Sequence, residues 1–203
     1  LSLDVIKSIK IIPKKELEKE FSVNLEKPLL LIVQHTVTTE INEVDKYFLE
    51  TINAIKETNQ QSIIISGNAD AGSQRIKKII KNSNILNYEN LPFIKYISLL
   101  YHSSAIIGNS SSGIMEAPFL HIPSINIGTR QEGRGKTESI MNVKYDKHEI
   151  KMAINKTLTD KKFLNSIKNQ NNEHGNGTSS KKIIQILEKL NFEKISIQKK
   201  LAY

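Results

Sequence analysis

The segment with the strongest chemical character covers residues 106–116, where an apolar, strand-like run ends at a glycine and small polar residues follow. We expect a helix to begin here, and backbone N–H groups at a helix start favour an anion. The hydroxyls of Ser110, Ser111 and Ser112 add donors for that anion. Glu116 would repel phosphate, but its carboxylate can accept two hydrogen bonds from a ribose diol. Phosphate together with a diol predicts a nucleotide site.

Three other groups of polar residues also follow apolar runs, at 34–36, 67–70 and 128–135. The apolar runs and the helical spacing between them predict strands at 29–33, 62–66, 85–88, 105–107 and 124–127. Strands alternating with helices predict an α/β fold with a Rossmann-like, doubly wound parallel sheet. Because such sheets bind ligands at the carboxyl ends of their strands, the four polar groups should converge on one edge.

The two ends of the chain differ from this central part. Residues 1–27 form two short amphipathic pieces separated by a proline, and the chain beyond about residue 145 has helical patterning. The last helix is expected to begin with a serine cap at residue 179 or 180. Residues 191–203 are charged, and we expect a weakly ordered tail.

Several single residues near the predicted strand ends have both a functional and a structural interpretation. His35 follows a buried strand and suits either phosphate contact and acid–base chemistry or a structural hydrogen bond to the backbone. Asn68 and Asp70 suit turn and cap chemistry first and sugar contact second. Leu91 and Tyr96 could pack against a base, and ordinary helix packing is an equal alternative.

Arginine is rare in this chain, which makes its positions informative. There are three arginines, Arg75, Arg130 and Arg134, and the last two fall in one glycine-rich segment after a predicted strand. A planar guanidinium with five donors suits phosphate or carboxylate recognition. Loop packing, or an ion pair with Glu132 or Glu116, is the structural alternative.

Composition excludes several classes of protein. The 203 residues contain no cysteine, so disulfides and thiolate metal sites are excluded. The net charge is 29 − 21 = +8, but lysine is spread along the chain without interleaved aromatic residues, so we expect no nucleic-acid partner. The sequence contains neither an apolar run long enough to span a bilayer nor a signal pattern at its start. We therefore expect a soluble cytoplasmic protein without membrane contact.

Taken together, the motifs resemble one enzyme family. Residues 35–39 (His-Thr-Val-Thr-Thr), 68–73, 108–116 and 128–134 (Gly-Thr-Arg-Gln-Glu-Gly-Arg) occur in the order that is typical of hydrolysing UDP-N-acetylglucosamine 2-epimerases of the sialic-acid pathway. The resemblance covers about residues 28–190. Non-hydrolysing epimerases usually carry Asp-Ser-Gly-Gly and Thr-Glu-Arg-Pro-Glu at two of these places, so both differences favour the hydrolysing branch.

The resemblance implies a fold and a set of residue roles. The family fold is GT-B-like, with two Rossmann-like domains facing each other across a cleft, and residues 28–190 correspond to the C-terminal domain, with 1–27 as a remnant of the interdomain linker. The implied reaction eliminates UDP across C1–C2 and then adds water, without cofactor or metal, and gives N-acetylmannosamine. In the implied site, His35 is the catalytic residue and faces the phosphates and the reacting sugar. Ser110 and Ser111 bind the diphosphate, Glu116 binds the ribose, and Arg130 contacts the nucleotide. Leu91 and Tyr96 surround the uracil, and the sugar or interdomain contacts are Asn68, Asp70 and Arg134.

The resemblance also implies what this chain lacks. The domain that supplies the acidic catalytic residues is absent, so we expect a nucleotide-binding half-enzyme that is inactive alone, with UDP or UDP-N-acetylglucosamine and the missing N-terminal domain as partners. A GT-B glycosyltransferase half and a non-catalytic nucleotide-sugar-binding domain are the alternatives. GDP-linked diamino sugars remain alternative substrates, and a homo-oligomer is an open alternative to a monomer.

Overall fold

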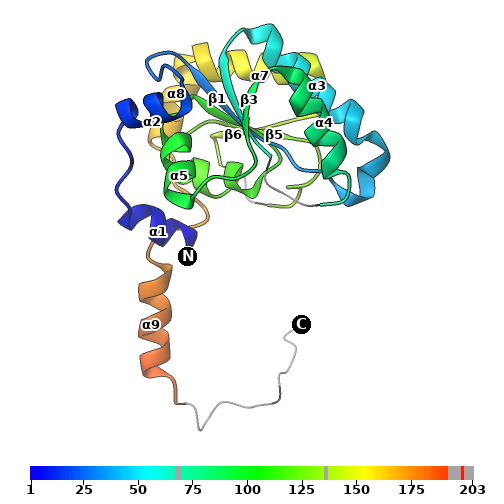
Figure 1. Ribbon diagram of the computed structural model, residues 1–203. Helices are drawn as coiled ribbons and strands as arrows, with labels where there is room; N and C mark the ends of the chain where they lie inside the picture. The colour runs from blue at the N-terminus through cyan, green and yellow to red at the C-terminus, as the bar shows by residue number, and fades with distance from the viewer. Residues whose placement is uncertain (67–69, 135–136, 192–197, 199–203) are drawn as a thin grey trace.

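The computed structural model describes residues 1–66, 70–134, 137–191 and 198. Its centre is a parallel six-stranded sheet with the order β3-β2-β1-β4-β5-β6, covered by helices on both faces (Figure 1). The strands are β1 Leu29–Val33, β2 Gln61–Ile65, β3 Leu86–Tyr88, β4 Ala105–Gly108, β5 Ser124–Ile127 and β6 Ile140–Val143. The predicted doubly wound, Rossmann-like sheet is confirmed.

The helices follow the strands in the expected alternation. They are α1 Ser2–Ser8, α2 Lys14–Phe21, α3 Val44–Thr58, α4 Ser73–Ser83, α5 Phe93–Tyr101, α6 Glu116–Phe119, α7 Lys147–Thr159, α8 Lys161–Lys168 and α9 Ser179–Lys189. Two short 3-10 helices, η1 Thr38–Glu43 and η2 Ser111–Gly113, follow β1 and β4. Both therefore lie at the carboxyl edge of the sheet, where the site is expected.

The central strand β1 shows why the sheet has two cores. All five of its residues are buried. Alternate side chains point to opposite faces, so Leu30 and Ile32 belong to a core with α3, α4 and α7, whereas Leu31 belongs to a core with α1, α2 and α5. Strand order reverses between β1 and β4, the point at which doubly wound sheets form a ligand crevice.

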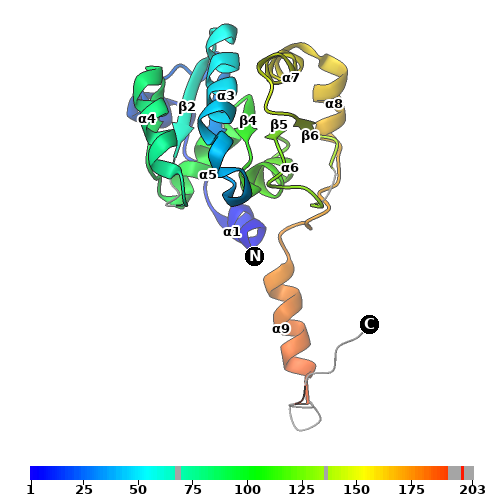
Figure 2. The same ribbon diagram turned by 90° about the vertical axis from the view of Figure 1, so that its right-hand side faces the viewer.

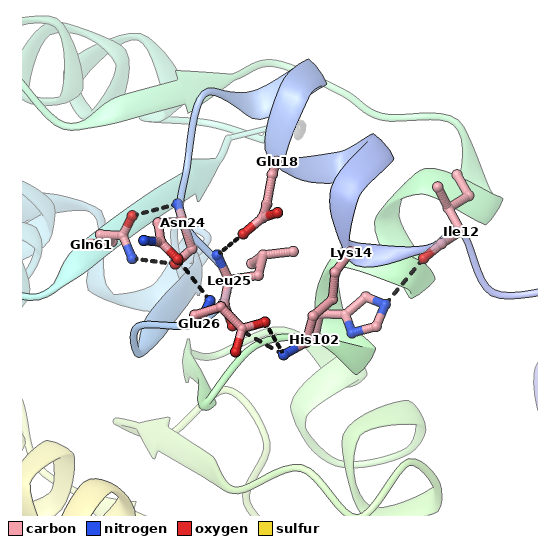
Figure 3. A network of polar contacts seen from close by, with 8 residues as sticks. All are labelled: Ile12, Lys14, Glu18, Asn24, Leu25, Glu26, Gln61 and His102. Carbon is pink, nitrogen blue, oxygen red and sulfur yellow. Dashed lines mark hydrogen bonds and ion pairs between the residues drawn. The ribbon is translucent and has the colours of Figure 1, made fainter.

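Residues 1–27 are part of the second core. Their buried apolar side chains are Leu3, Ile6, Leu17, Phe21 and Leu25. Figure 3 shows the polar contacts that add to this packing: the Gln61 amide accepts from the N–H of Asn24 and donates to its carbonyl oxygen, both at 2.8 Å, and His102 Nε2 lies 3.0 Å from the carbonyl oxygen of Ile12. This segment is therefore packed onto the domain, and its role as an interdomain linker stays a prediction.

The last helix, α9, extends away from the rest of the molecule in both views (Figures 1 and 2). The prediction that Ser179 or Ser180 caps it is wrong, because the cap comes from α1: Asp4 accepts hydrogen bonds from the N–H groups of both serines, at 3.2 and 2.7 Å. The exposed apolar side chains of α9 and its end are Ile183, Ile184, Ile186, Leu187 and Leu190. Among the described residues, no helix is long and apolar enough to cross a membrane.

Candidate functional site

The ends of β1 and β4 approach each other unusually closely at the switch point. Gly108 pairs with Val33 and has a φ of +130°, and a Cβ atom at this position would lie 2.2 Å from the carbonyl oxygen of Val33. Only glycine fits such an approach. The residues that follow β1 and β4 are thereby placed side by side.

Asn109, directly after this glycine, holds three of the predicted polar groups together. Its side chain is fully buried, accepts from the N–H of His35 at 2.7 Å and donates to the His35 carbonyl oxygen at 2.9 Å. Its own carbonyl oxygen accepts from Arg130 Nη1 at 3.1 Å and from Gln131 Nε2 at 2.7 Å. Neither Asn109 nor Gln131 is among the candidate site residues predicted from the sequence, where both appear only as parts of longer motifs.

His35 lies close to two charged side chains of the site, Arg130 and Asp70. The pKa of its imidazole is lowered from the ordinary value of 6.5, chiefly by burial and then by the positive charge of Arg130, while Asp70 acts in the opposite direction. The structure thus brings His35, Arg130 and Asp70 together, as the sequence predicts. The lowered pKa favours the neutral imidazole, which has one ring nitrogen that can accept a proton and one that can donate.

This lowered pKa predicts a pH-dependent stability. The unfolded chain binds a proton at His35 near pH 6.5, but the folded chain does so only at lower pH, so the free energy of unfolding should fall as the pH drops from 6.5 through the folded-state pKa. Urea unfolding between pH 7.5 and 5 would measure this loss. His35→Gln should flatten the profile, and His148→Gln, at an exposed position of α7, serves as the control. Equal slopes in the wild type and His35→Gln would contradict the assignment.

The serine segment differs from the expected helix start. Residues 111–113 form only one 3-10 turn, and the helix that follows, α6, has four residues. The Ser110 hydroxyl accepts from the N–H of Ser112, and the Ser110 carbonyl oxygen accepts from the N–H of Gly113. Those two amides are therefore engaged within the turn, and the expected helix start is replaced by a 3-10 turn and a four-residue helix. An anion here would depend on serine hydroxyls and the nearby guanidinium.

The second half of the motif adjoins the start of α5. Tyr96 carries a buried hydroxyl, and burial raises its pKa to about 12, with the negative charge of Glu116 adding to the effect and the Ser112 hydroxyl opposing it. Leu91 is partly buried and packs against the same core as Tyr96. The structure therefore brings Tyr96 close to Ser112 and Glu116, and their roles on a base and a ribose stay predictions.

A further polar network at this edge was not predicted. Thr129 Oγ1 donates to Glu40 Oε1 at 2.5 Å, and burial together with the negative charge of Glu40 raises the pKa of Tyr145. Tyr145 stacks on Tyr47 with ring centroids 3.9 Å apart, and a Cβ atom on Gly128 would collide with its ring. The network ties the segments after β1, β5 and β6 to one another.

Two further residues, Asn68 and Arg134, were predicted as sugar or interdomain contacts. Asn68 lies outside the described residues. Arg134 is exposed and lines a cavity between the segments that follow β5 and β6, together with Asn126. Within the described part of the chain, no group of three or more His, Cys, Asp or Glu side chains could hold a metal ion.

The fold and the contents of its switch point define a class of protein. A parallel doubly wound sheet with a serine turn, a histidine and an arginine at its carboxyl edge is a Rossmann-like domain of the kind found in GT-B proteins. More narrowly, the chain belongs to the UDP-N-acetylglucosamine 2-epimerase family, whose sequence model matches residues 2–188.

Individual relatives place the chain within this family. A protein from Campylobacter jejuni described as GDP/UDP-N,N'-diacetylbacillosamine 2-epimerase (hydrolyzing) is 36% identical over 149 residues, which are 70% of this chain and 39% of the relative. The structure of UDP-N-acetylglucosamine 2-epimerase from Neisseria meningitidis bound to UDP-N-acetylglucosamine has a TM-score of 0.62 and 21% identity, covering 93% of this chain and 51% of that one. An S. aureus structure with UDP has a TM-score of 0.71 at 15% identity, covering 92% and 52%. The chain thus spans about half the length of these structures.

Proposed function

We propose that this chain is the nucleotide-binding half of a hydrolysing 2-epimerase that converts UDP-N-acetylglucosamine to N-acetylmannosamine and UDP. The observation that carries the proposal is the convergence, at one switch point, of His35 and Arg130 on one side with Ser112, Glu116 and Tyr96 on the other. The first pair suits a diphosphate and the second group suits a nucleoside. The cytoplasmic location expected from the sequence belongs to the same proposal.

The proposed reaction has two steps. In the first, the C1–O bond to UDP breaks while a proton leaves C2, which gives a glycal; in the second, water adds across the double bond with inversion at C2. Arg130 and the hydroxyls of Ser110 and Ser111 stabilise the charge that develops on the departing diphosphate. His35, neutral at pH 7, faces the phosphates and the reacting sugar and handles a proton there.

Removal of the C2 proton requires a carboxylate of tuned pKa, and we assign this base to a second, Rossmann-like domain that would precede these residues in the complete protein. The exposed apolar side chains of α9 are consistent with a contact surface, because an exposed apolar stripe marks a site of interaction. The purified 203-residue chain should therefore release no N-acetylmannosamine from UDP-N-acetylglucosamine. Detectable release by this chain alone would refute its role as a half-enzyme.

The role of Glu116 on the ribose gives a direct test of binding. Glu116→Ala should weaken UDP about tenfold or more in calorimetric titration, since hydrogen bonds to a charged group are lost. The same substitution should leave the affinity for 2',3'-dideoxy-UDP unchanged, because that ligand has no diol. Glu188→Ala, on the exposed face of α9, is the matched control. An equal loss for UDP and the dideoxy nucleotide would place Glu116 elsewhere than on the ribose.

A second substrate is favoured by the description of the Campylobacter jejuni relative, which names GDP- and UDP-linked N,N'-diacetylbacillosamine. Parallel titrations with UDP and GDP show which of the two bases the domain binds more tightly. Binding of GDP at least as tight as that of UDP would shift the proposal to the diamino sugar. Sugar transfer to an acceptor by the complete protein would instead favour the glycosyltransferase alternative, and nucleotide-sugar binding without any turnover by the complete protein would favour the non-catalytic one.

A further inference from the structure

Glu40 connects two segments of the carboxyl edge that are 89 residues apart in the chain. It belongs to the 3-10 helix η1, which follows β1 and His35, and its Oε1 atom accepts a hydrogen bond from Thr129 Oγ1 at 2.5 Å. Thr129 directly precedes Arg130. The contact therefore links the segment that follows His35 to the segment that carries the guanidinium.

The turn that contains Glu40 is itself held in place by Arg75 of α4. Arg75 Nη1 donates to the carbonyl oxygen of Ile41 at 2.7 Å. Its Nε and Nη2 atoms donate to the two carboxylate oxygens of Asp45 at 2.9 and 2.8 Å. Such a two-pronged contact fixes the orientation of both groups. The Glu40 carboxylate thus extends from a turn that is tied to both α3 and α4.

Arg130 depends on its own segment for its direction. The residue is exposed, so packing does little to fix its side chain. On one side of it, Thr129 is bound to Glu40. On the other side, the buried Gln131 donates from Nε2 to the Asn109 carbonyl oxygen at 2.7 Å. If either contact is lost, the segment gains freedom on that side and the guanidinium moves with it.

Tyr145 connects the contact between Glu40 and Thr129 to the buried part of the site. Burial and then the negative charge of Glu40 raise the pKa of Tyr145, whereas the Asn109 side chain lowers it, so the phenol adjoins both side chains. The ring stacks on Tyr47, and a Cβ atom on Gly128 would lie 2.1 Å from it. Glu40 therefore lies beside a tightly packed ring on one side and the arginine segment on the other.

We propose that Glu40 is a positioning residue for nucleotide binding: by holding Thr129, it fixes the segment that presents Arg130 to a diphosphate. The carboxylate itself stays off the diphosphate, because two anions repel each other. The binding role rests on the proposed function, which assigns Arg130 to the diphosphate. The effect of Glu40 on the position of Arg130 does not depend on any ligand.

The test uses Thr129→Val and Glu40→Ala in the 203-residue chain, with calorimetric titration of UDP. Each substitution should weaken UDP about fivefold, and the double variant should lose no more than either single one, because both remove the same contact. Thr129→Ser, which keeps the hydroxyl, should bind UDP within about twofold of the wild type. The controls are Glu43→Ala, at the exposed end of η1, and Thr159→Val, at the exposed end of α7.

The pKa of His35, followed by NMR, separates positioning from a simple loss of charge. Removing a negative charge from the neighbourhood would by itself lower this pKa. Displacement of Arg130 should raise it, because the positive charge of Arg130 is one cause of its lowered value. Thr129→Val changes no charge, so a raised His35 pKa in this variant reports that Arg130 has moved.

A His35 pKa that does not rise in Thr129→Val would overturn the proposal. The same conclusion follows if the wild type binds UDP and both variants bind it equally well, or if the losses add in the double variant. If the wild-type chain binds no UDP, the proposed function fails, and the His35 pKa in Thr129→Val decides the positioning role by itself.

Discussion

Gly108→Ala is expected to lower the free energy of unfolding by about 4 kcal/mol, from backbone strain together with overpacking. The new methyl group would lie 2.2 Å from the Val33 carbonyl oxygen and 3.0 Å from the Gln34 nitrogen, on a backbone with a φ of +130°. Neither neighbour is the movable end of a side chain, so β1 and β4 would have to separate. Urea unfolding followed by circular dichroism measures the loss.

Gly133→Ala is the matched control, because this glycine also has a positive φ, +77°, but an added Cβ meets nothing within 4 Å. Its cost should be about 1 kcal/mol, from backbone strain alone. If the two alanine variants were equally stable, the contact between Gly108 and Val33 would not be what restricts this position.

Asn109→Leu is expected to destabilise the domain by about 3 kcal/mol and to weaken UDP binding at least tenfold. The leucine has a similar size, but it removes the hydrogen bonds that Asn109 makes to the partly buried N–H and carbonyl oxygen of His35. UDP binding suffers because His35 is no longer held against the segment that carries Arg130. Unfolding experiments and calorimetric titration measure the two effects.

Asn155→Leu, on the exposed face of α7, should change stability by no more than about 0.5 kcal/mol. A positioning role for Asn109 also predicts that the pKa of His35, followed by NMR in the folded variant, moves toward its ordinary value as the ring becomes less buried and the charge of Arg130 acts on it less. An unchanged His35 pKa together with full UDP affinity would reduce Asn109 to a packing residue.

How far the sequence predicts this fold depends on burial. The residues of β1 and β5 are all buried, and β1 is a continuous apolar run, whereas β5 alternates isoleucine with the polar residues Ser124 and Asn126. Both patterns predict a strand. Strand β6 was missed because none of its four residues is buried at this edge of the sheet, which leaves no continuous apolar signal. The helix expected from Ser112 is instead a single 3-10 turn, capped by Ser110, and the separate four-residue helix α6.

The amino-acid sequence by itself determined the alternation of strands and helices, the edge of the sheet that carries the polar groups, and most of the candidate residues. Only the tertiary structure decided how those residues meet. Asn109 and His35 are 74 residues apart, and Glu40 and Thr129 are 89 apart. Such pairs depend on the register between β1 and β4 and on which loops share an edge. The local pattern of apolar and polar residues predicts neither the strand register nor the pairing of loops, because both are set by packing between segments that are distant in the chain.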